Sequence, residues 1–262
     1  MNSRLRRRAY RATSVAGNGD NCNMTAVTWL GHATVVVDLD GQRIVTDPVL
    51  RRRVVHLRRD RAAAVPEGAS GVLLSHLHYD HLDLPSLKAF AKELPVVVPR
   101  GGARLLRAFA DVREVAAGES VELGGLLVDA VEALHDGRRH PGGASGPALG
   151  YVLRGSRSVY FAGDTDLFAG MAAFGPLDVA LLPVAGWGKK LGPGHLDPER
   201  AASALALLRP QVAVPIHWGT YRAGRRDPRS SAPAEAFARA AAQLAPDVRV
   251  EILHVAGTLD LD

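Results

Sequence analysis

The sequence is nearly without cysteine: Cys22 is the only one among 262 residues, so no disulfide can form within the chain. It also has no apolar run of about 18 residues, the length that a membrane-spanning helix requires. Three consecutive arginines, Arg6-Arg7-Arg8, are followed by no apolar stretch, and a secretory or twin-arginine signal is therefore not expected. Together these absences favour a cytoplasmic protein.

Most of the chain has no excess of basic side chains, although the formal net charge is +5. Residues 1–23 carry five arginines and one aspartate, and residues 24–61 carry seven arginines and four aspartates. The other 201 residues have a net charge of −2. This distribution argues against general nucleic-acid coating and leaves two interpretations of the basic quarter: a local contact with an anion, or a solvated tail and loop.

Residues 1–23 show no hydrophobic periodicity and are predicted to be a disordered basic tail. Met24, just before the first expected strand, is a candidate translation start. Residues 24–262 contain no fixed repeat and no clear linker, which indicates a single domain. The basic stretch 51–61 includes Val54, Val55 and Leu57, so weak membrane contact is an alternative to a plain surface loop.

Short apolar runs bounded by turn residues predict many strands, in keeping with 27 glycines and 16 prolines. Strands are expected over 27–30, 33–39, 43–46, 72–75, 96–98, 112–115, 121–123, 126–134, 149–153, 158–162, 179–183, 212–216 and 248–254. Helices are expected over 85–94, 103–110, 198–208 and 234–244, the third with Asp197-Pro198-Glu199 as a strong start signal.

The densest chemical pattern lies at 72–83, where an apolar run ends in His76, His78, Asp80 and His81. Side chains at i and i+2 of an extended chain point the same way, so His76 and His78 can face one point. Asp80 and His81 follow at the turn and can face a neighbouring point. Imidazole and carboxylate are good ligands for zinc and similar divalent ions. The pattern therefore predicts a metal site.

Four further strands also end in a potential ligand: Asp47, His135, Asp164 and His217. Loops at the ends of several strands of a layered domain meet at one edge. We therefore expect these side chains to lie with the histidine cluster.

This set of residues resembles the metallo-β-lactamase superfamily over residues 24–255. The resemblance implies an α/β fold, a four-layered αβ/βα sandwich of two mixed β-sheets with helices outside. Six motifs are similar to one branch, which contains N-acyl-phosphatidylethanolamine phospholipase D and the L-ascorbate-6-phosphate lactonases. They are Trp29-Leu-Gly-His-Ala-Thr34, Thr46-Asp-Pro48, Ser75-His-Leu-His-Tyr-Asp-His-Leu-Asp83, Ala162-Gly-Asp-Thr165, His195-Leu-Asp-Pro-Glu199 and His217-Trp-Gly219. The cysteine ligand of some true β-lactamases is missing, so antibiotic hydrolysis is not expected.

The resemblance implies two metal ions, zinc by preference, with manganese or iron also compatible with an N/O ligand set. One ion would take His76, His78, His135 and Asp164. The other would take Asp80, His81, Asp164 and His217, with Asp164 bridging the two. A shared hydroxide would then attack the substrate.

Residues around the ligands are expected to orient them or to contact the substrate. Asp47 is expected to orient a ligand histidine, or else to be a turn residue before Pro48. His195 is the candidate proton donor or substrate contact, unless it is a surface residue near a helix start. His32 is a candidate substrate contact or a packed core histidine. Arg138 and Arg139 are candidates for holding an anionic substrate.

The leading hypothesis is a dinuclear metal-dependent hydrolase acting on a phosphodiester or related ester, with a small or lipid-like anionic substrate. Opening of a sugar-phosphate lactone is the first alternative, and a nuclease that uses the basic tail as an arm is the second. Against the nuclease, the net charge beyond residue 61 is negative. The sequence predicts no oligomeric state.

Overall fold

The computed structural model describes residues 25–185, 191–223 and 230–261. The expected tail over 1–23 and the candidate start Met24 lie outside these residues. Two seven-stranded sheets and one small three-stranded sheet make up the β-structure of the described chain. Within it, no helix combines the length and the hydrophobicity that crossing a membrane requires.

The first sheet has the strand order β17-β1-β2-β3-β6-β7-β8. Its strands run antiparallel from β17 to β3 and parallel from β3 to β8. Their bounds are β1 Thr25–Gly31, β2 Thr34–Leu39, β3 Gln42–Thr46, β6 Gly71–Leu73, β7 Val96–Pro99, β8 Val112–Val115 and β17 Gly257–Leu261.

The second sheet repeats this plan with the order β16-β14-β13-β12-β11-β10-β9. It is antiparallel from β9 to β12 and parallel from β12 to β16. Its strands are β9 Ser120–Leu123, β10 Leu126–Glu132, β11 Leu149–Arg154, β12 Ser158–Phe161, β13 Leu177–Pro183, β14 Pro210–Ile216 and β16 Arg249–Val250. The small sheet joins β4 Arg53–Val54, β5 Leu57–Arg58 and β15 Arg222–Ala223.

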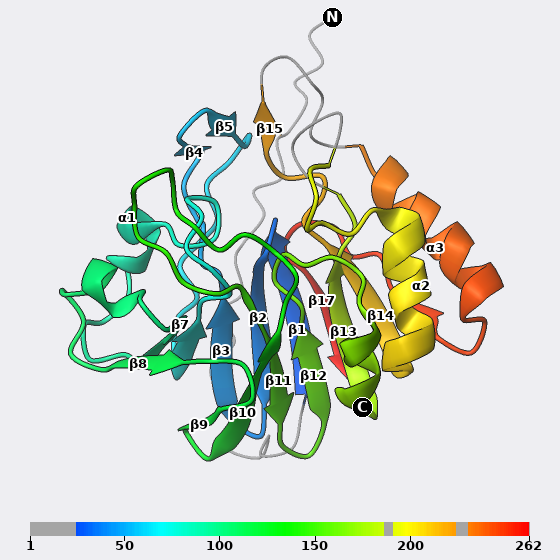
Figure 1. Ribbon diagram of the computed structural model, residues 1–262, viewed down its shortest axis with the longest axis horizontal. Coiled ribbons are helices and arrows are strands. Elements are labelled where there is room, and N and C mark those ends of the chain that lie inside the picture. The colour runs from blue at the N-terminus through cyan, green and yellow to red at the C-terminus, as the bar shows by residue number, and fades with distance from the viewer. Residues whose placement is uncertain (1–24, 186–190, 224–229, 262) are drawn as a thin grey trace, which may run out of the picture.

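The two large sheets pack face to face, and helices cover their outer sides (Figure 1). Trp29, Tyr151 and Phe161 are fully buried in the principal core, which also takes in α2 (Pro198–Leu208) and α3 (Ala232–Leu244). A second apolar cluster lies around β6, β7 and α1 (Leu84–Leu87). Burying each such side chain contributes about 1.5–3 kcal/mol. The expected αβ/βα sandwich of two mixed sheets is confirmed.

Helix α2 follows the predicted bounds, because its start is encoded locally. The Asp197 side chain accepts a hydrogen bond from the Arg200 amide, and Pro198 occupies the first turn, where its missing N–H costs nothing. The helix ends at Arg209, whose φ of 48° is left-handed. Helix α3 begins at Ala232, two residues before the predicted start at residue 234, and ends as predicted at Leu244.

Two predicted helices are wrong in length. The segment predicted over 85–94 is helical only as α1 and continues in turns that join residues three apart, such as Phe90 N–H to Leu87 O. The segment predicted over 103–110 contains only the 3-10 helix Ala103–Leu105. In the segment 85–94, Leu87, Phe90 and Leu94 are nevertheless buried. The apolar spacing there thus indicated which residues are buried, but not a continuous helix.

The last predicted strand, over 248–254, is also wrong, because only β16 forms there. The chain pairs again at β17, which runs antiparallel to β1 with Thr25 opposite Leu261. Polar and apolar residues alternate over Thr258-Leu-Asp-Leu261, and this period of two is the sequence signal that could have predicted a strand here. Sequence patterns also missed β4, β5, β15 and a 3-10 helix over Ala169–Ala173.

Candidate metal centre

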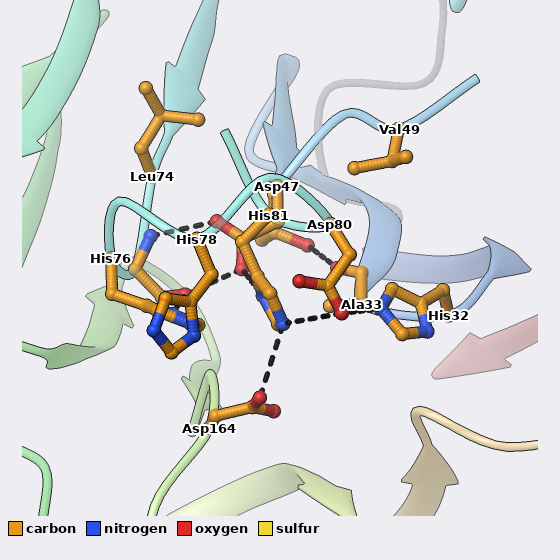
Figure 2. Close-up of polar contacts among 12 residues, drawn as sticks. His32, Ala33, Asp47, Val49, Leu74, His76, His78, Asp80, His81 and Asp164 are labelled. Carbon is orange, nitrogen blue, oxygen red and sulfur yellow. Dashed lines mark hydrogen bonds and ion pairs between the residues drawn. The ribbon is translucent and has the colours of Figure 1, made fainter. Parts of the chain in front are cut away.

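The predicted ligands meet where strands end, mostly at the carboxyl ends of the parallel strands. Asp47 follows β3, His76 follows β6, Asp164 follows β12 and His217 follows β14. Such edges are where open α/β sheets bind ligands. His81 lies between the pair His76 and His78 on one side and Asp80 on the other (Figure 2).

The first histidine group consists of His76, His78 and His135, whose ligand atoms lie within 4.8 Å of one another. His76 Nε2 is 2.9 Å from His78 Nδ1, and His135 Nε2 is 3.2 Å from the same atom. Three ring nitrogens therefore converge on one point, as trigonal binding of an ion requires.

In two rings of this group, the nitrogen that faces away from the group (the outer nitrogen) makes a hydrogen bond that fixes the tautomer. His135 Nδ1 lies 2.8 Å from the Gly194 carbonyl oxygen, to which it can only donate. The Ser75 hydroxyl donates to Asp47 and so accepts from His76 Nδ1 at 3.0 Å. In both rings Nε2 is then left without its proton, facing the group interior. This is the tautomer that binds a metal.

The second histidine group contains His32, Asp80, His81 and His217, with ligand atoms again within 4.8 Å of one another. His217 Nε2 lies 3.3 Å from His81 Nε2, and His217 Nδ1 donates to the Ala185 carbonyl at 2.8 Å. Asp80 Oδ2 is 3.9 Å from His81 Nε2. Unlike the first group, this one combines imidazoles with a carboxylate.

Asp164 joins the two groups. Its Oδ2 lies 3.2 Å from His81 Nε2, and its Oδ1 lies 3.3 Å from His217 Nε2 (Figure 2 draws the His81 contact). Asp164 also forms a cluster of ligand atoms with His135 and His195. Burial alone would raise the pKa of Asp164, but His217 and His81 hold it well below its usual value, so the side chain is a carboxylate.

The arrangement fits a bound cation. Asp164 Oδ1 is buried and has no hydrogen-bond partner among the described residues, since the contact with His217 lacks hydrogen-bond geometry. An unpaired buried carboxylate oxygen costs free energy, and so do the convergent lone pairs of the first group. Divalent ions would remove both costs.

Asp47 holds both groups in place. Its fully buried carboxylate accepts hydrogen bonds from the Ser75 amide at 2.7 Å, the Ser75 hydroxyl at 2.5 Å and His81 Nδ1 at 2.7 Å. It therefore fixes His81 directly and His76 through Ser75. This is the geometry expected of a residue that orients ligand histidines. The sequence prediction missed Ser75, although it stands directly before His76.

The histidines differ in their proton affinity. Burial lowers the pKa of His76 well below its usual value and that of His135 to about 4, so both are neutral at pH 7. Burial would also lower the pKa of His81, but the carboxylates of Asp164 and Asp47 raise it well above its usual value. Without a metal, His81 therefore holds a proton between two carboxylates.

His195 and His32 border the groups. The half-buried His195 ring lies 4.6 Å from that of His135, and its Nε2 is 3.7 Å from Asp164 Oδ2. His32 is buried, and its ring centroid lies 3.9 Å from that of His217 with the two rings tilted by 35°. Its Nε2 lies 3.1 Å from Asp80 Oδ2. Burial lowers the pKa of His32 to about 4, so it is a neutral partner of Asp80. Substrate contact by either residue stays a prediction.

Of the predicted anion-binding arginines, Arg139 lines a pocket beside the groups together with His78 and Asp80, but its guanidinium is already engaged. Arg139 donates from Nη1 to the Leu77 and Leu82 carbonyls at 2.7 and 3.1 Å, and so braces the histidine loop. Arg138 is exposed, and Arg51 pairs with Asp83 through two hydrogen bonds. Binding of a substrate by Arg138 and Arg139 stays a prediction.

Comparison with known proteins gives concordant results. A family model described as "Beta-lactamase superfamily domain" matches residues 42–218. A UPF0173 metal-dependent hydrolase of Methanopyrus kandleri is 34% identical over 87% of this chain and 96% of its own length. An uncharacterized protein of Mycobacterium tuberculosis is 30% identical over 75% of this chain, which corresponds to 59% of that protein.

Solved structures agree on the fold. Igni18, a metallo hydrolase of the archaeon Ignicoccus hospitalis, superposes with a TM-score of 0.71 over 92% of this chain and 99% of its own, at 22% identity.

Proposed function

The chain belongs to the metallo-β-lactamase superfamily and is a metal-dependent hydrolase, and on this premise we propose that its two histidine groups hold two divalent ions. His76, His78 and His135 would hold the first. Asp80, His81 and His217 would hold the second, and Asp164 would bind both. The observation that carries this proposal is the buried Asp164 Oδ1, which has no hydrogen-bond partner among the described residues and lies where the inner nitrogens converge.

Two such ions supply a hydroxide near neutral pH and offset the negative charge that develops on substrate oxygens. The protein residues fix the geometry: Asp47 holds the His81 ring, and Ser75 holds the His76 ring. His195 is half-buried beside Asp164 and is the candidate to contact the substrate or to protonate the leaving group. The donor set suits zinc and also manganese or iron.

The proposed reaction is hydrolysis of a phosphodiester or related ester, with a sugar-phosphate lactone as the alternative substrate. Both reactions need a nucleophile and stabilisation of negative charge at one centre, so the same ligand set supports either. A nuclease is less well supported, because the residues beyond 61 carry a net charge of −2.

The test is a protein in which His76 and His78 are both changed to alanine. We expect its metal content, measured by elemental analysis, to fall and its hydrolysis of bis-p-nitrophenyl phosphate, p-nitrophenyl esters and a panel of lactones to be lost. His254→Ala is the control, because this histidine is exposed and belongs to neither group. Normal metal content and full hydrolysis in the double variant would refute the proposal.

A further inference from the structure

A short hairpin, β4 and β5, stands beside the metal centre. Val54 pairs with Leu57, so Val55 and His56 form its two-residue turn, and Arg58 of β5 pairs with Arg222 of β15. The base of the hairpin is well anchored. Val49, Val54 and Leu57 pack with Tyr221, whose hydroxyl donates to the carbonyls of Arg51 and Val49. In Figure 1, β4, β5 and β15 lie together at the same end of the molecule.

The turn residue Val55 combines two unfavourable features. Its φ is 48°, a left-handed conformation that glycine adopts freely and a β-branched residue resists. Its apolar side chain is also 63% exposed. Backbone strain of this kind costs about 1–3 kcal/mol and clusters at functional sites. Both features disfavour a valine at this position, whereas contact with an apolar ligand would favour it.

Val55 forms one wall of a pocket of about 220 Å³ that opens on the metal centre. Leu57 and Tyr79 supply further apolar surface, and His78 and Asp80 line the same pocket. Tyr79 is 40% exposed. A group bound here would therefore touch mostly carbon while its other end lay at the proposed ligands.

The one arginine in the pocket wall is already engaged. The Arg139 guanidinium lies over the Tyr79 ring, 4.0 Å from its centroid, and Nη1 donates to two backbone carbonyls. Burial lowers the pKa of Arg139, which shows that its charge is poorly solvated. Among the described residues, then, this pocket offers an anion little and an apolar group a good deal.

We propose that the pocket between Val55 and Tyr79 binds an apolar group of the substrate, such as a medium-length acyl or alkyl chain. This proposal rests on the proposed hydrolysis and specifies its substrate: an ester with a hydrocarbon substituent rather than a sugar phosphate. Val55 sets the preference for the chain, while the histidine groups act on the ester bond next to it.

The experiment compares p-nitrophenyl hexanoate with p-nitrophenyl acetate in the metal-loaded wild type and in Val55→Asn. Wild type should show at least a tenfold higher kcat/KM for the hexanoate, since each methylene bound in an apolar pocket adds to the preference. Val55→Asn should lose that preference, so that its kcat/KM values for the two esters become similar. Asparagine tolerates a positive φ, so its Tm should be equal or higher. Val65→Asn is the matched control, an exposed valine that does not line the pocket.

A calorimetric titration with hexanoate and with acetate measures the pocket independently of turnover. Wild type should bind hexanoate at least tenfold more tightly, and Val55→Asn should bind the two alike. Equal binding in the wild type, or a preference that survives in Val55→Asn, overturns the pocket proposal even if every protein hydrolyses acetate. If no ester is cleaved while the binding preference holds, the assigned reaction fails and the apolar pocket stands.

Discussion

The first histidine group has only neutral partners at its outer nitrogens, whereas the second has a carboxylate at His81 and a neutral carbonyl at His217. The outer nitrogens of His76 and His135 meet a hydroxyl and a carbonyl, whereas that of His81 meets the Asp47 carboxylate. The second group also contains Asp80. Because carboxylates favour a proton as well as a metal, the second group holds a proton in the metal-free protein and the first does not. One fold thus offers two sites of different character.

The largest effect should come from Asp164, the residue that the two groups share. Asp164→Asn removes the negative charge that both ions would use. We expect a loss of hydrolysis of at least roughly 10²–10³-fold, comparable with removing one electrostatic stabiliser from other active sites. Elemental analysis should show fewer than two ions per chain. Asp166→Asn is the control, because Asp166 pairs with Arg200 outside the groups. Two retained ions and an unchanged rate would remove Asp164 from its proposed role.

A smaller effect, on metal affinity, should distinguish the two histidine groups from each other. Asp47→Asn would turn an amide N–H towards His81 Nδ1 or the Ser75 hydroxyl, both of which donate to this side chain. We expect metal affinity to fall about 10–100-fold, as for other residues that orient ligands, and more for the second ion. Ser75→Ala should weaken mainly the first ion, through His76. Competition with a chromophoric chelator measures each affinity, and equal weakening of both ions by both variants would contradict the difference drawn between the groups.

The smallest effect is on the stability of the metal-free protein as the pH changes. His135 has a folded pKa of about 4, below its unfolded value, so its contribution is complete above pH 6.5 and is lost as the pH falls towards 4. We expect this loss to be about 2 kcal/mol, allowing for partial exposure. The pKa of His81 is raised, so its contribution is present below pH 6.5 and is lost as the pH rises through the folded value.

Denaturant titrations of the metal-free protein between pH 4 and 9 measure both sides of this profile. His135→Gln should flatten the acid side, and His81→Gln the alkaline side. A wild-type profile that is flat from pH 4 to 6.5 would show that the first group does not keep its histidines neutral.

What could be predicted from sequence depended on whether the signal was local. Helix α2 was predicted because Asp197 and Pro198 encode its start within three residues. The convergence of seven candidate ligands could be predicted because strand ends share an edge. Ser75 and Val55 could not, since their roles depend on contacts with Asp47 and with the loop around Tyr79. The pairing of β17 with β1 could not be predicted either, because the two strands lie at opposite ends of the described chain.

Three residues of the candidate centre have a left-handed backbone: His32 with φ 56°, Asp47 with φ 33° and His217 with φ 64°. Glycine would relieve this strain at each position, and each replacement would delete a side chain of the centre. Selection for thermal stability alone would therefore tend to erode the centre. A directed-evolution programme aiming at a more robust enzyme should hold these three positions fixed and seek its gains elsewhere.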